Sequence, residues 1–307
     1  MINLQNDIYF HIGFHRTGTT FLQKFILPQY KDHAVLFLNE PYRFLSKYLI
    51  EESNSKLEEI LQSKFKEIQS CLNQPNKPII VSSEGLSGDI WTDNLDMAEK
   101  IYSVFSDGKI IICIRSQYTM IPSLYQYVYV KSGGCKSYAK YLNKIIENNK
   151  LDYYNIVTKY IDIFGEKNIK ILLYEDLKND QNSFLNDLLN FVNLPLTYKL
   201  SNDRNYKNYR YSLIVTKGVR LTNAVLTKKI IELLLNNNSN RIIKIRRFFM
   251  RFFSKLDSIN RRFNLFHPMP YEEYLYCREL IYKHYKESNR KLFKMLQLDK
   301  NKYDYPL

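Results

Sequence analysis

Short apolar runs alternate with segments of helical apolar spacing along the first two thirds of the chain. Within the runs almost every residue is apolar, as is typical of parallel strands that are buried on both faces. These runs lie at residues 7–13, 77–84, 108–115 and 168–175. Strands that alternate with helices predict an α/β fold of three layers, in which helices flank a mostly parallel central sheet.

Helices are predicted where apolar residues recur every three or four positions. Between the strands, this spacing occurs at residues 18–28, 56–73, 94–105, 117–131, 137–149, 152–164 and 181–192. Residues 193–208 gather Pro, Asn, Ser and Asp, which indicates an irregular connector. Beyond it the pattern is only helical, at 212–235, 240–263 and 271–295. We therefore expect a core of residues 1–208 and a helical C-terminal extension of residues 209–307 that packs on it.

The loop after the first predicted strand has the composition of an anion-binding loop. In the stretch "GFHRTGTT", Gly13 and Gly18 are separated by four residues, and two threonines follow. Glycines let the backbone curl so that its amides point inward, and the next helix presents its partially positive N-terminus to an anion. The lysine that follows the second glycine in nucleoside-triphosphate loops is missing, and the cation is Arg16. A turn that merely joins a strand to a helix is the alternative interpretation.

A second phosphate-binding pair follows the third predicted strand. Arg115 stands at the end of this strand, and Ser123 comes eight positions later, within the next predicted helix. An arginine fork gives charge-assisted contacts to phosphate, and a serine adds a short hydroxyl donor. Taken separately, the two would be a surface arginine at a strand end and an ordinary helix residue.

Together the two motifs resemble the family of sulfotransferases that use 3′-phosphoadenosine 5′-phosphosulfate (PAPS), over roughly residues 7–195. The resemblance implies a P-loop-like sulfotransferase fold and no metal ion. It also implies that Arg115 and Ser123 hold the 3′-phosphate, and that Arg16 stands where the family usually has a catalytic lysine. The loop that would bind the 5′-phosphosulfate comprises His15, Arg16, Thr17, Gly18, Thr19 and Thr20.

Glu84 is the candidate general base. It falls at the carboxyl end of the second predicted strand, the edge at which parallel α/β sheets place their ligands. Glycan-type members of the resembled family use a glutamate in about this place. The alternative is a carboxylate that caps a helix or pairs with Arg16. The segment "YEDL" at Glu175 and Asp176 also resembles the family, but we assign it no catalytic role, and Lys207 or Arg210 is a weaker candidate for reaching phosphate.

The net charge of +14 favours anionic partners. A basic amphipathic helix is predicted at residues 240–263. This helix either packs on the core with its cations in water, contacts an anionic membrane surface peripherally, or recruits an acidic glycan. The cysteines, Cys71, Cys113, Cys135 and Cys277, show no metal or disulfide spacing. With no predicted leader or membrane span, we expect a cytoplasmic protein, with peripheral contact to the inner membrane surface as an option.

The leading hypothesis is a sulfotransferase that moves a sulfuryl group from PAPS to a hydroxyl of a carbohydrate or glycolipid. One alternative is a small-molecule kinase of the phosphate-loop class, against which the missing lysine argues. Another is a non-catalytic protein that uses the same fold to bind polyanions or membranes. Nucleic acid is not an expected partner, because no recognisable nucleic-acid-binding motif is present.

Overall fold

The computed structural model describes residues 6–38, 77–87, 95–130, 133–200, 213–225 and 271–307, together with Phe252 and Lys255. Within these segments, five parallel strands form one sheet in the order β2-β3-β1-β4-β5. The strands are β1 (Ile8–Gly13), β2 (Val35–Leu38), β3 (Ile79–Ser82), β4 (Lys109–Ile114) and β5 (Ile169–Leu173). The predicted α/β fold and its four predicted strands are confirmed, whereas β2 was not predicted.

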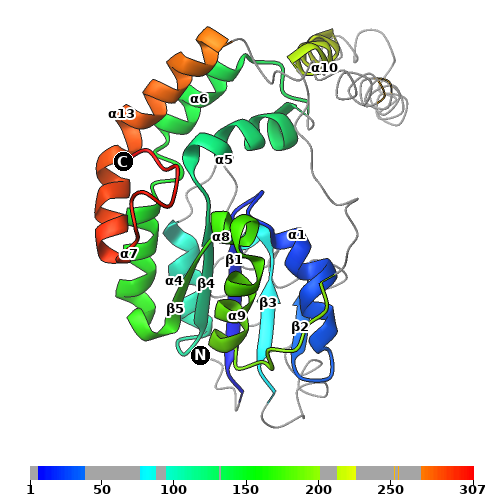
Figure 1. The fold of residues 1–307 in the computed structure, drawn as a ribbon, viewed down its shortest axis with the longest axis vertical. Helices are drawn as coiled ribbons and strands as arrows, with labels where there is room; N and C mark the ends of the chain where they lie inside the picture. Colours follow the sequence, from blue (N-terminus) through cyan, green and yellow to red (C-terminus); the bar gives the residue numbers. More distant parts are fainter. Residues whose placement is uncertain are drawn as a thin grey trace.

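The central strand β1 has a buried side chain at every position, which explains its continuously apolar sequence. It pairs with β3 and β4 in register, so that Phe10 lies opposite Val81 on one side and Ile110 on the other. These three side chains belong to a core cluster with α4 and α7, while Tyr9 and Ile111 belong to the cluster on the opposite face, with α9. Helices therefore cover both faces of the sheet (Figure 1).

The helical segments follow the predicted order. They are α1 (Thr19–Phe21), the π-helix η1 (Leu22–Ile26), the 3₁₀-helices η2 (Leu27–Tyr30) and η3 (Glu84–Ser87), α4 (Leu95–Val104), α5 (Gln117–Leu124), the π-helix η4 (Tyr125–Val130), α6 (Tyr138–Glu147), α7 (Tyr153–Phe164), the 3₁₀-helix η5 (Glu166–Asn168), α8 (Tyr174–Asn179), α9 (Gln181–Phe191), α10 (Leu213–Val225) and α13 (Tyr271–Met295). Side chains of Ser137, Asp152 and Asp180 cap α6, α7 and α9 by accepting from the third residue of each helix.

Two predicted helices are not regular α-helices. The segment predicted at 18–28 combines α1, η1 and η2, and the segment predicted at 117–131 changes from α5 to the π-helix η4. Pro122 lies inside α5 and has no backbone N–H, so it interrupts the ordinary hydrogen-bond ladder just before η4. The helix α8, which contains the "YEDL" segment, was not predicted.

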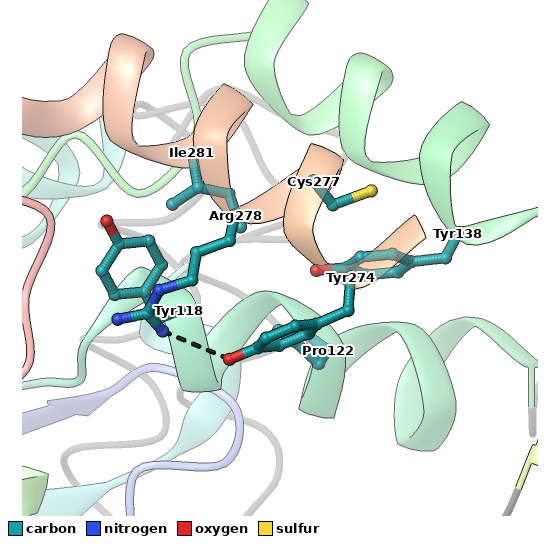
Figure 2. Close-up of a pocket in the computed structure, with 7 residues that line it drawn as sticks. All are labelled: Tyr118, Pro122, Tyr138, Tyr274, Cys277, Arg278 and Ile281. Atoms are coloured by element: carbon teal, nitrogen blue, oxygen red, sulfur yellow. Dashed lines mark hydrogen bonds between the residues drawn. The ribbon is translucent and has the colours of Figure 1, made fainter. Parts of the chain in front are cut away.

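The helix α13 runs alongside α6 and α7 and reaches α5 (Figure 1). Where it meets α5, the Arg278 guanidinium stacks on the Tyr118 ring at 3.7 Å and donates to the Tyr274 hydroxyl at 3.3 Å (Figure 2). The cavity there measures only about 10 Å³, room for about one water molecule. This pocket is therefore a packing defect between helices, too small for a substrate.

Several predicted features lie outside the described residues. These are the helix at 56–73, residues 226–235 of the helix predicted at 212–235, the connector residues 201–208, Lys207, Arg210, Cys71 and, apart from Phe252 and Lys255, the basic helix at 240–263. The helix predicted at 271–295 is confirmed as α13. The division into a core and an extension at residue 208 stays a prediction.

Candidate active site

The loop between β1 and α1 is tightly curled. The Thr17 amide donates to the Phe14 carbonyl at 3.2 Å, and the Thr17 hydroxyl donates to the same oxygen at 2.6 Å. Arg16 and Gly18 have positive φ angles of 74° and 94°. A positive φ is strained for arginine, and such strain is found where the surrounding structure holds a functional loop in place.

Both glycines of the loop are closely packed. A Cβ atom at Gly13 would lie 2.1 Å from the Thr19 hydroxyl oxygen, and one at Gly18 would lie 2.3 Å from a methyl carbon of Leu177. At Gly18 the left-handed backbone is a second reason for glycine. The glycine spacing seen in the sequence therefore reflects contacts of the loop with its own helix and with α8.

The buried hydroxyl of Thr19 has no hydrogen-bond partner among the described residues. Its residue is the first of α1, where backbone amides at the start of the helix also lack helical acceptors. An unsatisfied buried hydroxyl costs free energy, which an acceptor oxygen of a bound anion would recover. This observation fits the phosphosulfate group of PAPS in the loop.

Arg16 joins the two motifs that the sequence places far apart. Its Nε donates to the Ser123 hydroxyl at 3.1 Å, and its guanidinium stacks on the Tyr127 ring at 3.8 Å. Burial lowers the pKa of Arg16 from its ordinary value, and the positive charge of Arg115 lowers it further, while Tyr127 raises it. A partly desolvated cation at this place acts strongly on a nearby anion, because little water screens it.

Arg115 lies at the carboxyl end of β4 and is 9% exposed. Its Nε donates to the Thr119 hydroxyl at 2.9 Å, its Nη1 donates to the Arg16 carbonyl at 2.9 Å, and the guanidinium stacks on Tyr174 at 4.4 Å. Among the described residues its Nη2 makes no hydrogen bond, which leaves donors for a phosphate. Ser123 contacts Arg16 and not Arg115, although the sequence motif pairs it with Arg115.

Glu84 opens η3, directly beyond β3, and its Oε2 lies 2.8 Å from the His15 Nδ1. The side chains of Glu84 and His15 are 26% and 31% exposed, so an acceptor in solution can approach them. One interpretation of the sequence was that Glu84 pairs with Arg16. In the structure its carboxylate pairs with His15 instead. The other Glu84 oxygen has no hydrogen bond to a described residue.

The sequence motifs missed Tyr127, and they gave no role in this site to Tyr174 and Glu175 of the "YEDL" segment. Tyr127 and Tyr174 supply the aromatic faces for the two arginines, and the partly buried Glu175 accepts a hydrogen bond from the Ser116 amide at 3.0 Å. Burial raises the pKa of Glu175, although the hydrogen bond from Ser116 lowers it. The only sequence signal for Tyr127 was the aromatic run "YQYVY" after Ser123.

Two searches of the described segments give negative findings. No group of three or more His, Cys, Asp or Glu side chains in these segments is placed to hold a metal ion. No helix in them is long and apolar enough to cross a bilayer.

The fold and site together define the class of α/β proteins that bind a nucleotide through a P-loop-like turn at the carboxyl edge of a parallel sheet. Within this class the family can be stated. The family model described as "Sulfotransferase domain" matches residues 7–243, and the chain belongs to the sulfotransferase family. It is therefore an enzyme of the PAPS-dependent sulfotransferase type.

The chain also matches solved structures, among them two sulfotransferases. A sulfotransferase from Alicyclobacillus acidocaldarius is 15% identical with a TM-score of 0.46, and the match covers 79% of this chain and 99% of that one. A mouse sulfotransferase complexed with PAP, the desulfated nucleotide, is 16% identical with a TM-score of 0.37, over 67% of this chain and 64% of that one. No curated protein sequence matches the chain significantly.

Proposed function

We propose that this enzyme transfers a sulfuryl group from PAPS to a hydroxyl of a carbohydrate or glycolipid. The observation that carries the site assignment is the contact of Arg16 with both Ser123 and Arg115. These contacts join the loop after β1 to the residue that follows β4 and to the last turn of α5, so two independently recognised phosphate motifs form one cluster. Membership of the sulfotransferase family argues against the kinase alternative.

In this proposal the loop from His15 to Thr20 holds the 5′-phosphosulfate. The Thr19 hydroxyl, which has no partner among the described residues, and the amides at the start of α1 supply neutral donors. Arg115 directs its remaining Nη2 donors to the 3′-phosphate on the ribose. Ser123 accepts a hydrogen bond from Arg16 and adds a hydroxyl to the same cluster.

The bound PAPS supplies an activated sulfuryl group and leaves as PAP. Arg16 stabilises the negative charge that develops on the oxygen bridging phosphate and sulfate. Glu84 accepts the proton of the acceptor hydroxyl as the new bond to sulfur forms. His15, at 2.8 Å, fixes one carboxylate oxygen of Glu84 so that the other faces the acceptor.

A carbohydrate acceptor is supported by a cavity between η4 and α6. This cavity of about 210 Å³ is lined by Tyr129, Lys136, Lys140, Tyr141 and Lys144. The partly exposed Tyr129 offers an apolar ring to a sugar, Tyr141 supports it from the core, and the ammonium groups attract carboxylate or sulfate substituents. Because Tyr129 lies two residues after Tyr127, which stacks on Arg16, the cavity adjoins the same helical segment as the nucleotide cluster.

Two further parts of the proposal concern location. We expect the enzyme to act in the cytoplasm, and residues 240–263 to provide the optional contact with anionic lipid. Their basic amphipathic sequence supports the membrane contact, but they lie almost wholly outside the described residues.

Calorimetric titration with PAP tests the nucleotide site. We expect the native enzyme to bind PAP, and Arg115→Ala to bind it at least about 30-fold more weakly, because a charge-assisted bond to phosphate is lost. Arg290→Ala is the matched control, since Arg290 is exposed and pairs only with Glu287 on its own helix. Absence of PAP binding by the native enzyme would rule out the site assignment, and unchanged binding by Arg115→Ala would rule out Arg115.

A further inference from the structure

The segment after α13 returns to the nucleotide cluster. Two of its tyrosines, Tyr303 and Tyr305, are only 8% and 5% exposed. Their hydroxyls donate to consecutive carboxylates of α8: Tyr303 to Asp176 at 2.9 Å, and Tyr305 to Glu175 at 3.1 Å. We call residues 299–307 the C-terminal strap. It was predicted only as part of a helical extension, with no link to the active site.

A continuous chain of hydrogen bonds leads from the strap to the residue beside Arg115. The Tyr305 hydroxyl donates to Oε2 of Glu175, and the other oxygen of Glu175 accepts from the Ser116 amide at 3.0 Å. The Ser116 hydroxyl in turn donates to the carbonyl of Asp304. Ser116 is therefore bound from two sides, by α8 and by the strap itself.

The strap is fixed from its other side by α13. Arg278 forms an ion pair with Asp304 at 2.7 Å while its guanidinium stacks on Tyr118 of α5 (Figure 2). Asn289 donates to the carbonyl of Pro306 at 3.0 Å and exchanges hydrogen bonds with Gln117 at 3.0 and 3.1 Å. The strap and α13 thus hold residues 116–118 as a unit, which is the segment between Arg115 and Ser123.

We propose that Tyr305 and Glu175 are positioning residues for the 3′-phosphate site, and that the C-terminal strap thereby sets the preference for nucleotides with a 3′-phosphate. The inference rests on the proposed function, because it needs Arg115 to bind that phosphate. Tyr305 holds Glu175, Glu175 holds the Ser116 amide, and the fixed backbone aims Arg115. Preorganised donors lose less entropy on binding than mobile ones.

The chemistry of Glu175 is the reason to expect that this chain of hydrogen bonds depends on the Tyr305 hydroxyl. Burial raises the pKa of Glu175, and the bonds from Ser116 and Tyr305 oppose this change by favouring the charged form. Without the Tyr305 hydroxyl, the partly buried carboxylate would keep its bonds from the backbone amides of Ser116 and Glu175 but would lose its side-chain donor. A buried acceptor that loses its partner is costly, so the local backbone is expected to shift.

The test compares two nucleotides on one variant. The binding constants of PAP and of adenosine 5′-phosphate (AMP), which lacks the 3′-phosphate, are measured by calorimetry for the native enzyme and Tyr305→Phe. We expect the ratio Kd(AMP)/Kd(PAP) to fall by at least about fivefold in Tyr305→Phe, with Kd for AMP changed less than about twofold. A merely structural role would weaken both nucleotides equally and leave the ratio unchanged.

Tyr303→Phe is the matched control, because Tyr303 lies on the same strap but donates to Asp176, which does not contact Ser116. The ratio Kd(AMP)/Kd(PAP) of Tyr303→Phe should equal that of the native enzyme. Should Tyr305→Phe fail to fold, Glu175→Gln and Glu175→Ala decide the matter. In Glu175→Gln the side-chain carbonyl oxygen can still accept from the Ser116 amide, so most of the preference for PAP over AMP should remain. In Glu175→Ala this acceptor is gone, and the preference should be lost.

The outcomes separate this inference from the proposed function. A native enzyme that binds PAP no better than AMP would overturn the 3′-phosphate assignment itself. If the native enzyme prefers PAP and Tyr305→Phe keeps the same ratio Kd(AMP)/Kd(PAP), only the positioning role of the strap is overturned.

Discussion

Arg16 combines three unusual features at one residue: a positive φ of 74°, a partly buried guanidinium and a contact with an aromatic ring. The resembled family usually has lysine here. The stack on Tyr127 requires a planar cation, and the bond from Nε to Ser123 leaves the two terminal nitrogens for a ligand. The contacts with Tyr127 and Ser123 suit an arginine better than a lysine. We therefore interpret Arg16 as the cation that replaces the usual lysine in this site.

Turnover with labelled PAPS and a hydroxylated acceptor tests the two catalytic assignments. We expect Arg16→Ala and Glu84→Gln each to lower kcat by at least about 100-fold, since one removes charge stabilisation and the other the base. Arg16→Lys keeps the charge but loses the stack, so its kcat should lie between those of the native enzyme and Arg16→Ala. Glu166→Gln, at an exposed glutamate, is the control. Full turnover by Glu84→Gln would show that another group is the base.

His11, within β1, predicts how stability depends on pH. Burial lowers its pKa to about 4 from the ordinary 6.5, and its Nδ1 lies 2.8 Å from the Ser82 hydroxyl. The unfolded chain therefore binds a proton below pH 6.5 that the folded protein refuses until about pH 4. Stability falls as the pH is lowered through this window.

Urea denaturation at pH 6.5 and pH 5 checks the prediction for His11. The free energy of unfolding should drop by about 1.6 kcal/mol between these pH values from this residue alone. His11→Asn should be less stable at pH 6.5 but lose less on acidification, whereas His33→Asn, at an exposed histidine, should keep the native pH dependence. If the free energy of unfolding fell equally between pH 6.5 and pH 5 in the native protein and in His11→Asn, the assignment to His11 would be wrong.

At the scale of elements, the apolar pattern predicted the long strands and most helices. The strands β1 and β4 have buried side chains at nearly every position, so their sequences carry a strong signal. By contrast, β2 has only four residues, three of them partly exposed, and was missed. The π-helices were also not predicted, because the apolar spacing of a few residues does not distinguish π from α hydrogen bonding.

The sequence also predicted only part of the candidate site. Residues in local motifs, such as Arg16, Arg115 and Ser123, were found because motif spacing is visible in the sequence. The contact of Ser123 with Arg16 was not foreseen, because it depends on the turn of α5 that carries Ser123 toward the loop. Glu175 and Tyr305 lie 130 positions apart, and no local pattern links them.

The cavity between η4 and α6 yields a prediction about the acceptor. If it binds an acidic saccharide, Lys140→Ala and Lys144→Ala should each raise KM for a uronic-acid or sulfated oligosaccharide by about fivefold, more at low salt, because cation contacts are lost. Neither should change the binding of PAP or KM for a neutral oligosaccharide. Lys167→Ala is the control for an exposed lysine elsewhere. Equal use of acidic and neutral acceptors would refute the acidic preference.

At the scale of the whole molecule, the nucleotide site is assembled from both ends of the described chain. The proposed anion loop follows the first strand, Arg115 of the proposed 3′-phosphate site follows β4, and the strap that bonds to the neighbouring Ser116 comes from residues 299–307. The net charge of +14 makes the protein cationic as a whole, which suits a polyanionic donor such as PAPS.

The bond between Ser116 and Asp304 spans 188 positions of sequence, and this separation bears on how the enzyme reaches its working state. Contacts between distant residues form late in folding, because a long loop must close before they add stability. The sheet and anion loop are therefore expected to form before the 3′-phosphate site is complete. A nucleotide that binds only the complete site would shift the equilibrium of this last folding step toward the native state by mass action.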